Sequence, residues 1–382
     1  MNATDKTLWL IDTTLRDGEQ SPGVSFSPKD KIVIATLLAE AGMDELEAGI
    51  PAMGESERRD ILALNQLSLP CRITSWCRAL HKDLEWSADA GAASVHIGFP
   101  MSDIHLSVME KTRESVLGDL SFLVTYARRY FDHVSVGAMD ATRASEEFLH
   151  LFVTEARTAG AYRVRIADTV GLASPSTTAA LIKGLVRIEP NLIYEFHGHN
   201  DLGMATANAL TAAENGAGAL STTLNGLGER AGNAPTEEVV AALRFASTLS
   251  CNVNPARLTP ACRYVAQVTK RPVHKNKPIT GREVFDHESG IHGHAQLKNP
   301  LSFQPFLPED VGHHPGRLVL GSHSGTATLT HLLGQAGIAV DRDHAGPLME
   351  DIRRFARQKK AALSADDLVA IYHKTADASG VI

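Results

Sequence analysis

One pattern recurs eight times between residues 8 and 248: a short apolar run, a polar loop and an amphipathic stretch of helical length. The apolar runs, expected to be strands, span residues 8–11, 45–48, 71–75, 94–97, 133–136, 163–167, 192–196 and 219–222. The amphipathic stretches, expected to be helices, span residues 28–41, 55–66, 82–90, 105–129, 145–159, 175–187, 202–215 and 235–247. Parallel strands need such crossovers, and eight tilted strands close around a filled interior. The sequence therefore predicts an α/β fold, a (β/α)₈ TIM barrel.

The main alternative is an open, doubly wound sheet that binds a phosphate group after its first strand. Such a sheet is marked by a GxGxxG segment at that point. Residues 15–20 read LRDGEQ instead, which favours the closed barrel.

The chain changes character after Lys270. Residues 271–278 are basic and flanked by prolines, which is typical of a linker. Beyond them lie many His and Gly residues and then two expected helices, at 345–358 and 365–376. The sequence thus predicts a catalytic barrel over residues 1–270 and a smaller, mainly helical C-terminal region over residues 271–382.

The composition excludes several classes of protein. There are 37 Lys and Arg residues against 44 Asp and Glu residues, giving a net charge of −7 without a basic block. This balance disfavours nucleic acid or an anionic membrane as the main partner. No apolar run reaches the roughly 20 residues of a membrane span, and the first six residues are polar, unlike a signal peptide. Four cysteines without a CxxC pair fit neither a disulfide scaffold nor a zinc ribbon. We expect a cytoplasmic protein.

Metal-binding residue types follow three of the expected strands. In an extended strand, His197 and His199 point to the same side, and Gly198 between them lets the backbone lie close to a ligand. Asp17 after the first strand and Asn233 after the eighth offer oxygen ligands at the same rim. Two imidazoles, a carboxylate and an amide without a thiolate favour a catalytic divalent ion over a structural zinc. Such an ion would hold and polarise a bidentate substrate such as a 2-oxo acid.

Three charged residues near this rim each permit two interpretations. Arg16 is either a rim ion pair with Asp17 or a fixed cation that faces an oxygen becoming negative in the transition state. Glu195 should share the strand face of His197 and serve as a base or as a structural acceptor. Glu47 is either a functional carboxylate or one paired with Arg78 or another cation.

Two further segments are less specific. Residues 225–233 carry three glycines whose amides suit phosphate or carboxylate oxygens, but a plain loop has the same spacing. Residues 287–294 and 321–325 are rich in His, as surface or interface histidines would be; a zinc site there would lack a nearby thiolate.

Four ordered motifs resemble one family, the acyl-CoA-condensing enzymes that include isopropylmalate, citramalate and homocitrate synthases. The motifs are DTTLRDGEQ at residues 12–20 with Lys31, HGHNDLG at 197–203, GERAGN at 228–233 and SGIH at 289–292. The likeness runs from about residue 8 to residue 330. Within the family, residues 49–54, 76–79 and 319–325 resemble homocitrate synthases of the nitrogen-fixation type.

The resemblance implies a role for each matching residue. The metal ligands would be Asp17, His197 and His199, with Asn233 close by. Arg16 would face the 2-oxo oxygen, and Thr169 would hold a substrate carboxylate. The distal part of the pocket would be lined by Gln20, Glu47 and His105. The implied cofactor is a divalent ion, with Mg²⁺ or Mn²⁺ favoured over Zn²⁺ or Co²⁺. Met139 departs from the family, because relatives often carry an acidic residue at this loop.

The resemblance also implies a homodimer in which the C-terminal region completes the partner's active site. His292 would reach that site and, with Glu195, deprotonate acetyl-CoA, the cosubstrate. The implied reaction is condensation of acetyl-CoA with 2-oxoglutarate and hydrolysis of the thioester. Alternatives are the same chemistry on pyruvate or 2-oxoisovalerate, a lyase of the 3-hydroxy-3-methylglutaryl-CoA type, or a catalytically idle barrel that acts as a binding partner.

Overall fold

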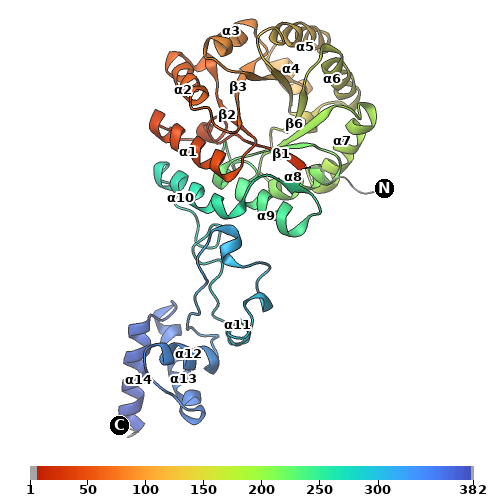
Figure 1. Cartoon of the computed structure of the whole chain (residues 1–382). Coiled ribbons are helices and arrows are strands. Elements are labelled where there is room, and N and C mark those ends of the chain that lie inside the picture. Colours follow the sequence, from red (N-terminus) through yellow and green to blue (C-terminus); the bar gives the residue numbers. More distant parts are fainter. Residues whose placement is uncertain (1–6, 380–382) are drawn as a thin grey trace. The chain divides into compact units, whose positions relative to one another are not determined.

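The computed structural model describes residues 7–379, and it confirms the closed barrel (Figure 1). Eight parallel strands pair in chain order, and β1 also pairs with β2 and β8, which closes the ring. The strands are β1 Thr7–Asp12, β2 Glu45–Gly49, β3 Arg72–Arg78, β4 Ser94–Pro100, β5 His133–Met139, β6 Arg163–Asp168, β7 Ile193–Gly198 and β8 Ala219–Thr222. All eight coincide with the expected runs to within a few residues.

Helices surround the strands on the outside of the barrel (Figure 1). They are α1 Pro28–Ala41, α2 Glu55–Gln66, α3 His81–Asp89, α4 Asp103–Val108, α5 Arg113–Ala127, α6 Glu146–Ala159, α7 Pro175–Ile188, α8 Ala205–Glu214, α9 Thr236–Ala246 and α10 Leu258–Val268. Local sequence explains several ends. Ser27 and Ser174 each accept a backbone hydrogen bond at the start of α1 and α7, and Gly42 and Gly160 end α1 and α6 with a left-handed backbone.

The expectation of one helix over residues 105–129 was wrong. The structure has two helices there, α4 and α5, separated by a turn in which Glu110 has a φ of +52°. Thr112 then starts α5 through reciprocal hydrogen bonds with Ser115. The apolar residues keep helical spacing across this turn, which is why a single helix was expected, but the capping residues determine where the second helix begins.

Two elements that close the barrel region were not predicted. After α9, β9 Ser250–Cys251 pairs with the start of β1, and α10 packs against α1. The apolar core of this region joins strand residues such as Val164 to inward helix residues such as Ile34 and Val124. It lies between the strands and the helices, whereas charged side chains fill much of the barrel interior.

The chain divides into two compact units at the bond between Val273 and His274. The second unit contains α11 Gly290–Gln296, α12 Thr326–Gln335, α13 Arg342–Lys359 and α14 Ala365–Ser379. The last two correspond to the two expected helices, whereas α11 and α12 were not predicted. A small apolar cluster, including Leu329, Leu333 and Ile352, holds α12, α13 and α14 together.

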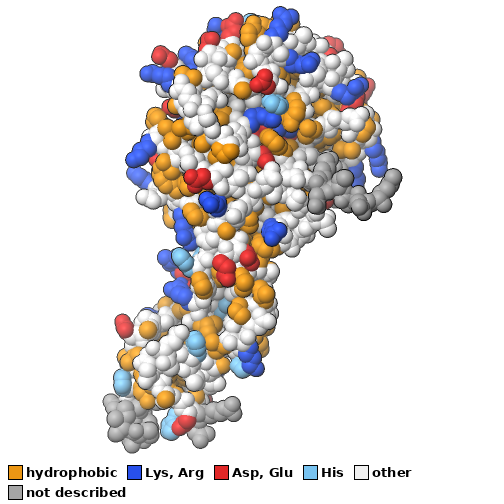
Figure 2. All heavy atoms as spheres, viewed as in Figure 1, with side chains coloured by type: hydrophobic (Ala, Val, Ile, Leu, Met, Phe, Trp, Pro, Cys, Tyr) orange, Lys and Arg blue, Asp and Glu red, His pale blue; other side chains and the backbone are white. Residues whose placement is uncertain are grey.

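The outer surface is of mixed charge. On the face of the barrel seen in Figure 2, Lys and Arg side chains alternate with Asp and Glu, without a large block of one sign. Across residues 7–379, no helix combines the length and the apolar character that crossing a membrane requires.

Candidate active site

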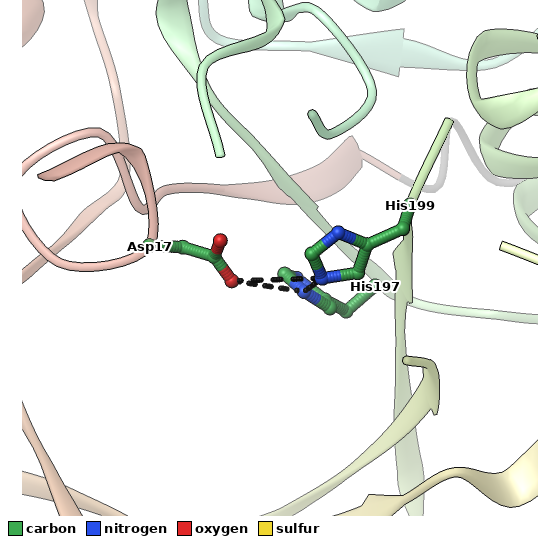
Figure 3. A group of neighbouring side chains, drawn as sticks. All are labelled: Asp17, His197 and His199. Carbon is green, nitrogen blue, oxygen red and sulfur yellow. Dashed lines mark hydrogen bonds and ion pairs between the residues drawn. The ribbon is translucent and has the colours of Figure 1, made fainter. Parts of the chain in front are cut away.

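Three predicted metal ligands meet at the carboxyl end of the barrel strands. Asp17 follows β1, and His197 and His199 lie at the end of β7, with their side chains directed at one another (Figure 3). The Nε2 atoms of the two imidazoles are 3.3 Å apart, and they lie 3.3 and 3.8 Å from Asp17 Oδ2. Ligands about 2.1 Å from one ion lie about 3.0–3.4 Å from each other. Two of the three separations fall in this range and the third, 3.8 Å, is slightly wider, so a small movement of His199 would place all three atoms around one divalent ion.

Asn233 lies beside these ligands with one free oxygen. A backbone bridge pairs it with His199, and its amide nitrogen donates to Asp17 Oδ1 at 3.0 Å and to the Leu227 carbonyl. The Asn233 Oδ1 atom is buried and accepts no hydrogen bond. A Cβ on Gly228 would stand 2.2 Å from the Asn233 side chain, so only glycine leaves room for it. The donor set of two imidazoles, a carboxylate and this unpartnered oxygen therefore fits a divalent cation.

A continuous series of ion pairs runs from the lower barrel interior to this site, and we call it the ion-pair ladder. In order, its members are Arg72, Glu45, Arg163, Glu195, Arg165, Glu47, Arg16 and Asp17, with N···O separations of 2.5–3.3 Å. Barrel interiors usually hold branched aliphatic side chains instead. Because cations and carboxylates alternate, each buried charge has partners of opposite sign, and the guanidinium of Arg16 is fixed beside Asp17.

The electrostatic surroundings keep the ligands ready to bind. Burial alone would raise the pKa of Asp17, but Arg16 and His197 hold it well below its usual range. Burial and the neighbouring His197 lower the pKa of His199 to about 4. Asp17 is thus a carboxylate and His199 a neutral imidazole at neutral pH, which are the forms that bind metal ions.

A cavity of about 230 Å³ opens beside these ligands. Its walls include six of the predicted site residues: Arg16, Asp17, Gln20, Thr169, His197 and His199. The Thr169 hydroxyl accepts a hydrogen bond from the Asp140 backbone N–H at 2.8 Å, which leaves its own proton available to donate.

Four other predicted residues are not on the cavity wall, and among them are Glu47 and His105, which were expected to line its distal part. The Glu47 carboxylate is fully buried and forms ion pairs with Arg16 and Arg165, so of its two interpretations the structure shows the one in which it is paired with a cation. That cation is not Arg78, which pairs with Asp83. His105 lies on α4, 3.9 Å from Asp140. The other two residues, Glu195 and Asn233, are fully buried. Glu195 is paired with Arg163 and Arg165 and accepts a hydrogen bond from Ser221, and Asn233 donates to Asp17.

His292 lies in the second unit, on the short helix α11. Its half-buried ring stacks on Phe303 at a centroid distance of 4.1 Å and lies 5.8 Å from His287. Among the described residues, the metal-ligand grouping is confined to Asp17, His197 and His199, so the histidines of the second unit form no comparable cluster.

Four residues that line the cavity were not predicted from the sequence: Trp76, His96, Gly137 and Arg165. Arg163 and Arg165 are two residues apart in β6, so both face the barrel interior, where an arginine is unusual. That spacing was the available signal. Trp76 contacts Arg16 through its ring, 5.7 Å from the guanidinium carbon.

The chain belongs to the HMGL-like family, whose description matches residues 7–265. Residues 279–360 match a second family, the homocitrate synthase post-HMGL domain-like family. Two relatives match over nearly the whole chain. The 2-isopropylmalate synthase 2 of Caldanaerobacter subterraneus subsp. tengcongensis is 41% identical over 369 residues, which cover 96% of both chains. The homocitrate synthase of Frankia sp. is 42% identical over 371 residues, which cover 95% of this chain and 90% of the relative.

A third relative has a different name again. The (R)-citramalate synthase of Methanocaldococcus jannaschii is 39% identical over 367 residues, which cover 96% of this chain and 74% of the relative. Among solved structures, the HMG-CoA lyase of Brucella melitensis superposes with a TM-score of 0.63 at 19% identity, covering 69% of this chain and 99% of that one. That likeness establishes the barrel fold alone.

Proposed function

We propose that this chain is a homocitrate synthase, which condenses acetyl-CoA with 2-oxoglutarate and hydrolyses the thioester to give homocitrate and CoA. The observation that carries the proposal is the grouping of Asp17, His197 and His199 beside Arg16 in one cavity. Relatives about 40% identical over nearly the whole chain are named as homocitrate, isopropylmalate and citramalate synthases, which supports this class of reaction. The segments at 49–54, 76–79 and 319–325 favour the nitrogen-fixation type.

In the proposed reaction, a base takes a proton from the methyl group of acetyl-CoA, and this carbon forms a bond to the ketone carbon of the 2-oxo acid. The ketone oxygen becomes a hydroxyl group, and water then cleaves the thioester into a carboxylate and the CoA thiol. A divalent ion bound by Asp17, His197 and His199, with Asn233 in reach, would polarise the ketone. Arg16 faces the oxygen that becomes negative, and Thr169 donates to the substrate carboxylate.

His292 is the proposed base, reaching the site of a partner subunit in a homodimer. Glu195 enters the proposal as a positioning residue for Arg165 rather than as a base. Both of its carboxylate oxygens are occupied by Arg163, Arg165 and Ser221, and it does not line the cavity. The methyl proton is too weakly acidic for imidazole alone, so donors near the thioester oxygen must stabilise the enolate as it forms.

The test is a thiol-release assay with acetyl-CoA and three acids in parallel: 2-oxoglutarate, pyruvate and 2-oxoisovalerate, each with Mg²⁺, Mn²⁺, Zn²⁺ or Co²⁺ after chelation. We expect the highest kcat/KM with 2-oxoglutarate and no turnover in the chelated enzyme. Preference for pyruvate or 2-oxoisovalerate would replace homocitrate by citramalate or isopropylmalate and keep the chemistry. Absence of CoA release with every acid would reject the condensation.

A further inference from the structure

The floor of the cavity contains two basic side chains that the proposed mechanism has not used. Arg165 and His96 both line it, and both are almost fully buried. Arg165 is held from two sides, by Glu195 at 2.5 Å and by Glu47 at 2.8 Å, so its guanidinium cannot swing away. Two of its five N–H groups remain beyond the three contacts that these carboxylates make.

His96 is held in a similar way by one partner. Its Nδ1 atom lies 2.9 Å from the Ser135 hydroxyl, which is 3.3 Å from the Val95 carbonyl as well. When Ser135 donates its single proton to Nδ1, at the shorter distance, the neutral ring presents Nε2 as an N–H donor. Burial and the nearby Arg165 lower the pKa of His96 well below its usual range. A neutral donor beside a fixed cation is suited to receiving a carboxylate without adding further uncompensated charge.

Gly137 makes room for the imidazole of His96 beside the cavity. It lies on β5 and lines the cavity, and a Cβ at this position would stand 2.5 Å from His96 Nε2. That distance is too short for any side chain, so every other residue would displace the imidazole or cover it. The imidazole therefore occupies the room that a side chain at position 137 would need, and both residues line the cavity.

The charge balance of the site favours a substrate with two negative charges. The ion-pair ladder contains four guanidinium groups and four carboxylates, so its net charge is zero. At the rim, Arg230 pairs with Asp201 and Glu229; the Glu229 side chain is 59% exposed, so solvent screens its charge and the buried part of the site stays neutral. A divalent ion on Asp17, His197 and His199 would add two positive charges, which a diacid neutralises and a monoacid leaves half compensated.

We propose that Arg165 and His96, whose place beside the cavity depends on Gly137, bind the second acid group of a 2-oxo diacid and so determine specificity. This inference rests on the proposed condensation. The first carboxylate and the ketone would lie at Thr169, Arg16 and the metal ligands, and the chain of the substrate would extend down the cavity toward the floor. Trp76, Ile50 and Met139 line the apolar wall along that path.

The test compares Gly137→Ala and His96→Leu with the wild type on 2-oxoglutarate and pyruvate. We expect each variant to lose at least about 10-fold in kcat/KM for 2-oxoglutarate and less than about 3-fold for pyruvate, because only the diacid loses a charge-assisted contact. The matched control is Gly118→Ala on α5, where an added Cβ meets nothing within 4 Å. Metal content and calorimetric binding of 2-oxoglutarate provide readouts that do not depend on turnover.

The outcomes separate this inference from the function on which it rests. Equal losses for both acids, or no loss for either, would overturn the inference while the condensation stands. A wild type that uses only the monoacids would also overturn it. CoA release with none of the acids would reject the proposed function itself. Arg165→Lys keeps a cation between Glu47 and Glu195, so it serves as a third variant that preserves folding; loss of diacid preference there supports the inference.

Discussion

The barrel and the C-terminal unit hold their charged and imidazole groups in different ways. In the barrel, the ion-pair ladder is buried, and it fixes Arg16 and Asp17 within 3.0 Å of each other. In the C-terminal unit, ion pairs such as Arg317 with Asp286 include a solvent-exposed partner. His292 is held by stacking on Phe303 and lies on a helix of seven residues.

This difference has a functional meaning. A metal site and a fixed cation work through preorganised geometry, which a buried, fully paired interior supplies. His292 is proposed to act in the active site of a partner subunit, so the residues that surround it there would come from the partner and not from its own unit. We therefore expect changes in the barrel to affect metal binding and stability, and changes at His292 to affect turnover alone.

The largest effect is expected for His197→Ala. Removing one of two imidazoles leaves the divalent ion with too few ligands, so metal and activity should be lost together, with CoA release falling by about 10³-fold or more. Elemental analysis of the purified variant and the thiol-release assay measure the two losses. His150→Ala on α6, far from the metal ligands in sequence and absent from the cavity wall, is the control. Full metal content in His197→Ala would contradict the metal assignment.

A smaller and more selective effect is expected for His292→Ala. This variant should keep metal content and 2-oxo acid binding and lose about 10²-fold in turnover, as removal of a general base does. Thiol release and calorimetry separate the two quantities, and His294→Ala on the same helix is the control. Wild-type turnover in His292→Ala would show that the base assignment is wrong.

Mixing two inactive variants tests whether the site is shared between subunits. In a mixed dimer of Asp17→Asn and His292→Ala chains, one of the two sites keeps both native residues. Random exchange should therefore restore roughly a quarter of wild-type activity. If unfolded and refolded mixtures stay inactive while each parent still forms dimers, His292 does not act across the interface.

Much of the fold could be predicted because the barrel repeats one local pattern. Each strand is a short apolar run, and helix starts such as Ser27 and Ser174 carry their own capping residues. The pattern failed where capping acted against apolar spacing, at Thr112, and beyond residue 270, where short helices such as α11 lack a long apolar face. Those elements depend on contacts between distant segments, which periodicity does not reveal.

The grouping of Asp17, His197 and His199 could be predicted for a similar reason. His197 and His199 share a strand face by parity, and strand ends meet at one rim, so the sequence sufficed to place them. Glu47 and Glu195 have the same parity, but their roles depend on Arg163 and Arg165, which lie on a strand more than 100 residues from Glu47 in sequence. Which side chains pair across the barrel interior depends on how the ring of strands closes, so these ion pairs could not be predicted from the pattern of any single strand.

The smallest expected effect tests the buried interior itself, through Glu45→Gln. Burial alone would raise the pKa of Glu45, but Arg163 and donors including Thr74 lower it to about 2 from an ordinary value of 4.5. Because the ionised carboxylate of Glu45 is stabilised in the folded state, its contribution to stability is complete above pH 4.5 and is lost as the pH falls through about 2.

The Glu45→Gln variant should therefore unfold about 3 kcal/mol more easily at pH 7 and show a shallower loss of stability between pH 4.5 and 2. Urea unfolding at several pH values measures both, and the control is Glu85→Gln of the exposed Lys82–Glu85 pair, which should leave stability almost unchanged because solvent screens the pair. Parallel pH curves for Glu45→Gln and the wild type would mean that the ladder does not depend on the charge of Glu45.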